Sequence, residues 1–168
     1  EGTGTTGALL SGLKHVDEDS FILLYGDVVL TFDEIQKFCD SPGDAICSAL
    51  VNPLGSELPQ NWMCANVTND TIDAVLGHPR DDVTHRFAGL FVLSKSFLPY
   101  VKRTMDSMQS VQVGMMSPDE PQFEDAIQSA IDNGETVRAV QASHRAFDID
   151  KPWHYLEASF YWNEYVCG

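Results

Sequence analysis

Three short apolar runs, separated by helix-like patterns, constrain what this chain can fold into. They are FILLYG at 21–26, DAICSALV at 44–51 and HRFAGLFVLS at 85–94. A run of this length between turn residues is typical of a strand buried on both faces of a sheet, and we predict 21–26 as a central parallel strand. Because helical patterns lie between and after the runs, the sequence predicts a parallel α/β sheet covered by helices.

Helical patterns and their end signals place the remaining elements. We predict helices at 7–16, 32–39, 96–105, 123–134 and 152–165. Thr31 is predicted as the N-cap of the second helix, with Glu34 as its capping-box partner. Gly134 is predicted to end the fourth helix, and Pro152 suits the first turn of the last.

A hairpin and a loop interrupt the alternation of strands and helices. Residues 61–76 contain two alternating patterns around the polar turn 68–70, which indicates a β-hairpin. Residues 106–121 are polar and are predicted as a long loop, and a last strand is predicted within 136–142. Because the linkers are short and no repeat is present, we expect residues 1–168 to form a single domain.

Charge and cysteine content exclude several classes of function. The chain has 25 acidic and 10 basic residues and a formal net charge of −15, which repels nucleic acid and anionic lipid. We therefore expect neither nucleic acid nor a membrane as partner, and no apolar run approaches the ~20 residues of a membrane span. The four cysteines form no CxxC pair, so we predict free thiols and a cytoplasmic location.

Carboxylates follow two of the predicted strands at the places where ligands bind open α/β sheets. Asp27 ends the run at 21–26, while Asp148 and Asp150 lie between a strand and the last helix. Carboxylates placed in this way can share Mg²⁺, with phosphate oxygens completing its shell. The alternative interpretation is that these residues are ordinary helix caps and turn residues.

The order of several motifs resembles that of the sugar-phosphate nucleotidyltransferases over nearly all 168 residues. The motifs are GTGTTGALLSGL, FILLYGDVVL, a hairpin ending in VLGHP, FAGLFVLS, FEDAIQSAIDNG and AFDIDKPWHYLEA. The resemblance implies a Rossmann-like, three-layer α/β/α mixed sheet of the glycosyltransferase-A type. It also implies a magnesium-dependent reaction of a nucleoside triphosphate with a sugar 1-phosphate, which gives a nucleotide sugar and pyrophosphate.

The resemblance also implies roles for the nucleotide and metal residues. Gly2 and Thr3 match the pair that lines the nucleobase pocket, and Gly26 belongs to the Gly-Asp motif on the nucleotide side. Asp27 and Asp148 match the two catalytic carboxylates that bind magnesium.

The positions that match the sugar site depart from the family pattern. Ala88 and Gly89 match the small residues that let the sugar approach the backbone, but Phe87 stands where the family often has asparagine. His78 stands in place of a lysine that helps hold the phosphorylated sugar, and Gln122 in place of a glutamate that binds sugar hydroxyls. A neutral histidine is a poorer phosphate ligand than lysine. Sugar recognition is therefore the part of the implied function that these residues support least.

The family pattern opens with a strand and a Gly-x-Gly-Thr-Arg loop, which nothing before Gly2 supplies. We therefore expect a domain that is incomplete at its N-terminus, inactive alone, and either homo-oligomeric or paired with a missing N-terminal segment. Two alternatives stay open. The chain could be a non-catalytic binding or assembly module, or a glycosyltransferase that binds metal through the Asp-x-Asp motif at 148–150.

Overall fold

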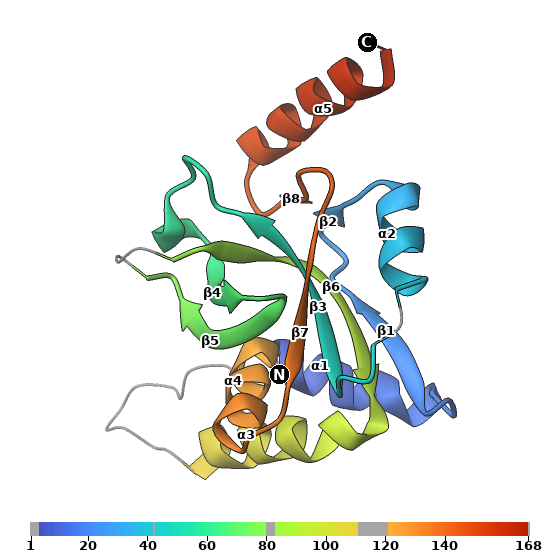
Figure 1. Cartoon of the computed structure of the whole chain (residues 1–168), viewed down its shortest axis with the longest axis vertical. Coiled ribbons are helices and arrows are strands. Elements are labelled where there is room, and N and C mark those ends of the chain that lie inside the picture. Colours follow the sequence, from blue (N-terminus) through green and yellow to red (C-terminus); the bar gives the residue numbers. More distant parts are fainter. Residues whose placement is uncertain (1–3, 42, 80–82, 111–120, 168) are drawn as a thin grey trace.

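The computed structural model describes residues 4–41, 43–79, 83–110 and 121–167. They form a six-stranded sheet in the order β1-β6-β3-β7-β5-β4, beside a two-stranded sheet of β2 and β8 (Figure 1). The strands are β1 (Ser20–Leu24), β2 (Val28–Val29), β3 (Cys47–Pro53), β4 (Met63–Thr68), β5 (Thr71–Gly77), β6 (His85–Ser94), β7 (Val137–Gln141) and β8 (Phe147–Asp148). The helices are α1 (Gly4–Gly12), α2 (Phe32–Cys39), α3 (Leu98–Ser110), α4 (Phe123–Asp132) and α5 (Pro152–Cys167), with 3₁₀ turns at Leu13–His15, Pro59–Asn61 and Lys95–Phe97.

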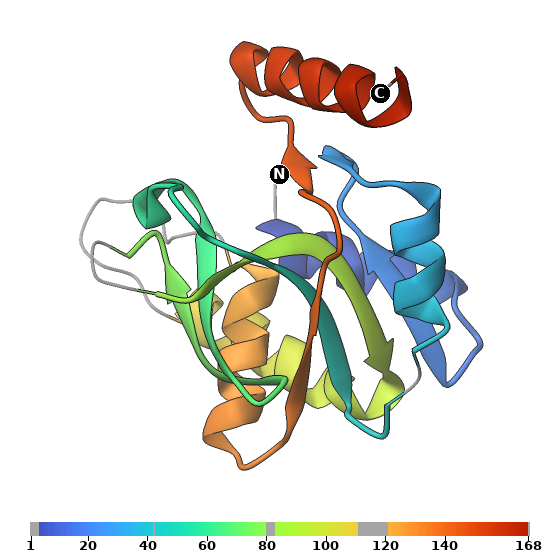
Figure 2. The same cartoon turned by 45° about the horizontal axis from the view of Figure 1, so that its top comes forward.

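The alternating side chains of β6 divide the core between the two faces of the sheet. Phe87 and Phe91 belong to the larger cluster, which also receives buried side chains from α1, α3 and α4. Ala88 and Leu90 point to the smaller cluster, where Phe38 of α2 packs. The two views in Figures 1 and 2 show α1, α3 and α4 on one side of the sheet and α2 on the other. The predicted three-layer α/β/α architecture is thereby confirmed.

The strand directions differ from a parallel sheet. Only β3 and β7 run parallel among the described pairings, and β6 runs antiparallel to both β1 and β3. The sheet is therefore mixed, as the family resemblance implies and the apolar runs alone do not.

The position predicted for residues 21–26 is wrong. Within the described residues, β1 pairs with β6 alone and forms an edge of the sheet. Ile22 and Leu24 are 52% and 45% exposed as a result. The apolar run is typical of a central strand, whereas the described residues pair with only one of its two edges.

The predicted hairpin and most helix signals are confirmed. β4 and β5 are joined at Asn69 and Asp70, which both have positive φ, as expected for a tight two-residue turn. Gly134 follows α4 with φ +85°, and Pro152 begins α5.

The N-terminus of α2 confirms one half of the predicted capping box. The Thr31 hydroxyl accepts a hydrogen bond from the Glu34 backbone N–H at 2.9 Å. The Glu34 carboxylate does not complete the box, because it accepts backbone N–H bonds from Ser143 and His144. Glu34 therefore ties α2 to the segment that leads into β8.

Two further boundaries differ from the prediction. α1 begins at Gly4, so the last four residues of the GTGTTG segment at 2–7 are helical. α3 continues to Ser110, although a loop was predicted from residue 106, and the rest of that loop at 111–120 lies outside the described residues.

α5 extends from the body of the molecule in both views and exposes Trp153 and Phe160.

Candidate functional site

The short pairing of β2 with β8 brings the two predicted metal carboxylates together. Val28 lies opposite Asp148 in this antiparallel pair, and the Ile149 N–H donates to the Asp27 carbonyl oxygen at 2.8 Å. Asp27 lies in the turn that follows β1, and Asp148 is the last residue of β8. Residues near opposite ends of the sequence are thus neighbours, as the rule for strand ends predicted.

Asp148 has the features of a carboxylate that awaits a ligand. Its Oδ1 is buried and has no hydrogen-bond partner among the described residues. Burial raises the pKa of the Asp148 carboxyl, and the charges of Asp27 and Asp150 raise it further. A bound cation would lower this pKa again, because its positive charge favours the charged carboxylate.

The described residues fit Mg²⁺ only as a two-carboxylate site. No group of three or more histidine, cysteine, aspartate or glutamate side chains within the described ranges could hold a metal by itself. Magnesium is commonly held by one or two carboxylates, with waters and substrate phosphates completing its octahedron. Asp27 and Asp148 therefore fit the ion when a phosphorylated substrate is present.

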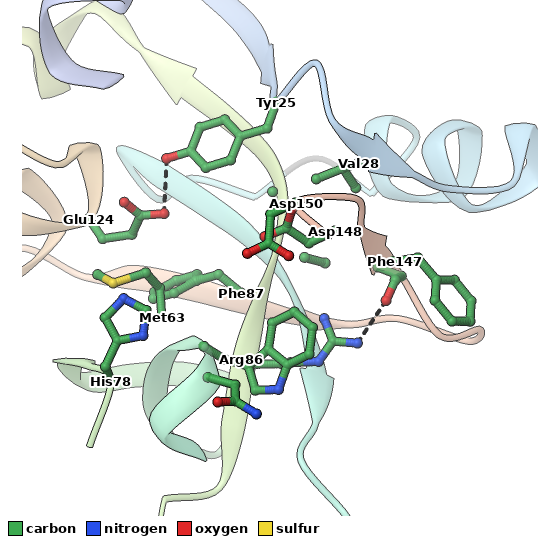
Figure 3. A pocket seen from close by; sticks show the side chains of 15 residues that line it. Tyr25, Val28, Met63, His78, Arg86, Phe87, Glu124, Phe147, Asp148 and Asp150 are labelled. Atoms are coloured by element: carbon green, nitrogen blue, oxygen red, sulfur yellow. Dashed lines mark hydrogen bonds between the residues drawn. The ribbon is translucent and has the colours of Figure 1, made fainter. Parts of the chain in front are cut away.

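A cavity of about 130 Å³ is lined by Asp148 but not by Asp27 (Figure 3). Three of the four predicted sugar residues line it, namely His78, Ala88 and Gly89, whereas Gln122 does not. The Gln122 side-chain oxygen instead accepts a hydrogen bond from the Thr5 hydroxyl, which joins α1 to the start of α4. In the structure, Gln122 therefore links two helices and is not part of the cavity wall.

Gly89 keeps the wall of the cavity close to the metal carboxylates. Its φ is +71°, and a Cβ added there would lie 2.6 Å from Cγ2 of Val28. The Gly89 carbonyl also accepts a hydrogen bond from the Tyr25 N–H at 2.9 Å. Glycine is thus needed here so that β2, and with it Asp148, can pack against β6.

The sequence analysis missed two side chains of the cavity, Tyr25 and Glu124. The Tyr25 hydroxyl donates to Oε1 of Glu124 at 2.9 Å, and both residues line the cavity. Burial raises the pKa of both groups. Glu124 lies in the first turn of α4, where glutamate is an ordinary helix-start residue, so the sequence carried no signal for this role.

A buried arginine forms another wall that the sequence analysis missed. The Arg86 guanidinium pairs with Glu57 at 2.5 Å and donates to the Ala146 carbonyl at 2.7 Å. It also lies over the Trp62 ring, 4.4 Å from the ring centroid. The charge of Arg86 is thus compensated by Glu57, and its bond to Ala146 holds the segment before β8 in place.

Asp150, the second carboxylate of the Asp-x-Asp motif, also lines the cavity. Its Oδ1 lies 2.6 Å from Nδ1 of His154, and its Oδ2 lies 3.5 Å from Nζ of Lys151. Each Asp150 oxygen therefore faces a neighbouring basic side chain, whereas Oδ1 of Asp148 has no hydrogen-bond partner among the described residues.

The predicted nucleotide residues are placed only in part. Gly26 follows β1 and lines an apolar groove of about 460 Å³ between β1 and α1, together with Asp27. Gly2 and Thr3 lie outside the described residues. The structure therefore shows where Gly26 lies and leaves the nucleobase pocket as a prediction.

Two further observations concern the predicted environment of the chain. Cys39, Cys47 and Cys64 carry free thiols. Among the described residues, none of the helices is both long enough and apolar enough to span a bilayer.

This chain is similar to known proteins in its structure, and the comparisons of its sequence found no match. No protein-family model and no curated protein matches the sequence. The inositol-1-phosphate CTP transferase from T. maritima matches with a TM-score of 0.69 and 19% identity, over 90% of this chain and 58% of that chain. The UTP-bound UGPase from Acinetobacter baumannii matches with a TM-score of 0.68 and 19% identity, over 97% of this chain and 57% of that one.

This chain thus spans less than two thirds of the length of either structure. The match nevertheless covers nearly all of its own length, including the sheet and the helices on both faces. The chain has the Rossmann-like α/β fold of these nucleotidyltransferases.

Proposed function

We propose that residues 1–168 form one domain of a magnesium-dependent sugar-phosphate nucleotidyltransferase. The reaction joins a nucleoside triphosphate to a sugar 1-phosphate and releases pyrophosphate. One observation carries the proposal: the β2–β8 pairing brings Asp27 next to Asp148, which lines the cavity and keeps a buried oxygen without a hydrogen-bond partner among the described residues. The fold shared with known nucleotidyltransferases supports it.

In this proposal Asp27 and Asp148 hold Mg²⁺, which offsets the negative charge that gathers on the phosphates during transfer. The sugar occupies the cavity against the backbone of Ala88 and Gly89, with His78 at its edge. Gly2, Thr3 and Gly26 remain predicted contacts of the nucleotide.

The glycosyltransferase alternative is less well supported by the same residues. An Asp-x-Asp metal site would use Asp150 as a ligand, but both of its oxygens already face His154 and Lys151. Freeing Asp150 would leave Lys151 and His154 without this partner. We therefore retain Asp27 as the second metal carboxylate.

The free edge of β1 favours a second candidate function, in assembly. Exposed Ile22 and Leu24 lie on a strand that pairs with β6 alone among the described residues, next to the apolar groove. An exposed apolar edge strand is a site for pairing with another strand. We propose that this edge associates with a second copy of the chain or with another polypeptide segment. A homo-oligomer is the simplest case.

A binding measurement on the purified chain tests the proposed catalytic role. Each nucleoside triphosphate is titrated into the protein by calorimetry, with and without Mg²⁺. We expect magnesium-dependent binding that Asp148→Asn weakens by more than about tenfold, because the substitution removes a charged metal ligand.

Asp73→Asn is the matched control, since Asp73 is exposed on β5 and does not line the cavity. Binding that is independent of Mg²⁺, or equal in Asp148→Asn and the unmodified chain, would remove the carboxylate pair from the site.

A further inference from the structure

Tyr25 and Glu124 come from distant parts of the sequence and meet at the cavity wall. Tyr25 directly follows β1, and Glu124 lies in the first turn of α4. Figure 3 shows the two side chains together on one side of the cavity, with Asp148 and Asp150 on the other. The cavity is therefore bounded by carboxyl groups at both ends.

Glu124 has more hydrogen-bonding capacity than the protein uses. Its side chain is almost fully buried, with 3% of the residue exposed. Among the described residues, the Tyr25 hydroxyl is the side-chain group that donates a hydrogen bond to it. A carboxyl group has two oxygens and about four acceptor positions, so the single bond from Tyr25 leaves acceptor positions of Glu124 for other donors. A ligand in the cavity can satisfy the remaining positions.

The chain contains a matched pair that serves structure alone. The Tyr100 hydroxyl donates to Oε1 of Glu135 at the same 2.9 Å and links α3 to the residues after α4. Neither of these residues lines the cavity. A tyrosine–glutamate bond is thus no evidence of a ligand by itself, and the Tyr25–Glu124 pair differs from its counterpart by its place in the cavity wall.

We propose that Glu124, held in place by Tyr25, determines substrate specificity by hydrogen bonding a hydroxyl group of a phosphorylated polyol. This inference rests on the proposed nucleotidyltransferase function. The phosphate of such a substrate would lie toward Asp27 and Asp148 with their cation, since an uncompensated carboxyl group repels it. The polyol ring would then extend toward Glu124. A hydroxyl group fits this place because it both donates and accepts hydrogen bonds.

The chemistry predicts discrimination against substrates that lack the hydroxyl. A site built to bind a hydroxyl group leaves its own polar groups unpaired when a deoxy analogue occupies it, and the analogue is rejected. Glu124 and Tyr25 would both lose partners in that case. Specificity then depends on this pair more than on Gln122, which does not line the cavity.

The test titrates glucose 1-phosphate, inositol 1-phosphate and their deoxy analogues into the magnesium-loaded chain. We expect Glu124→Leu to weaken binding of at least one hydroxylated ligand by about tenfold or more, and to abolish its preference over the deoxy form. Glu124→Gln keeps a donor and an acceptor and should remain within about threefold of the unmodified chain. Glu135→Leu is the matched control and should change nothing in binding.

Two measurements separate the possible outcomes. Thermal unfolding shows whether Glu124→Leu still folds. If it does not, binding of the polyol phosphates is judged from Glu124→Gln and Tyr25→Phe instead. Unchanged polyol phosphate binding in Glu124→Leu, or an equal loss in Glu124→Gln, would overturn the inference while magnesium-dependent nucleotide binding persists. Nucleotide binding without any polyol phosphate binding would also overturn it. Absence of both would overturn the proposed function itself.

Discussion

The neighbouring strands β1 and β6 are both rich in apolar residues and very different in environment. Leu24 of β1 and Leu90 of β6 are direct partners in the antiparallel register. Leu90 is fully buried and Leu24 is 45% exposed. β6 has a strand on each side, whereas β1 has one among the described residues. The comparison teaches that apolar content predicts which segments need covering, and that neighbouring strands decide which of them are covered.

The largest expected effect comes from shortening the two paired leucines. Leu90→Ala should lower the free energy of unfolding by about 2–5 kcal/mol, because it opens a cavity in the core. Leu24→Ala should lower it by less than about 1 kcal/mol, because much of the side chain is already in water. Urea unfolding measures both values, and equal losses would show that the edge of β1 is covered in solution.

Gly89 in the middle of β6 and Gly26 just after β1 should differ in the same direction. Gly89→Ala should lower the free energy of unfolding by about 1–3 kcal/mol, because of its positive φ and the close approach of Val28. It should also weaken magnesium-dependent nucleotide binding, since Asp148 pairs with Val28. A Cβ at Gly26 would meet nothing within 4 Å, so Gly26→Ala serves as the control for the change in stability.

Unfolding is measured on both glycine variants, and nucleotide titration is measured on Gly89→Ala and the unmodified chain. A tolerated Gly89→Ala, with binding intact, would contradict the role that we give to the contact between β6 and β2.

The smallest effect on stability is expected at the exposed edge itself. Ile22→Lys should change the free energy of unfolding by less than about 0.5 kcal/mol and should abolish self-association through β1. Analytical ultracentrifugation of the unmodified chain should show an oligomer that becomes monomeric in the variant. Asp73→Lys on β5 controls for the added charge. A strictly monomeric unmodified chain would rule out self-association at this edge.

Local signals in the sequence predicted much of the fold. The turn at 68–70, the N-cap Thr31 and the stop at Gly134 act over a few residues, and the structure confirms each of them. The edge position of β1 was not predictable in this way, because it depends on which strands pair with it. The Glu34 carboxylate illustrates the same limit, since its partners Ser143 and His144 are distant in sequence.

The candidate site was predictable where a general rule of folds applied. The rule that ligands gather at strand ends predicted Asp27 and Asp148 as neighbours. No such rule marked Tyr25, Glu124 or Arg86, because each is an ordinary residue in its own segment. Only the packing of α4 and the segment 144–146 against the sheet gives these side chains a shared cavity.

The β2–β8 pairing has a consequence for the order in which the molecule folds. The hairpin of β4 and β5 joins adjacent residues and can form early, whereas β2 and β8 are far apart in sequence and their pairing is short. Closing such a long loop costs entropy that two residues of pairing repay poorly. We therefore expect the carboxylates to meet last. A ligand that binds both carboxylates would stabilise the folded chain by mass action. Its binding would show that β2 and β8 have paired, because the two carboxylates meet only then.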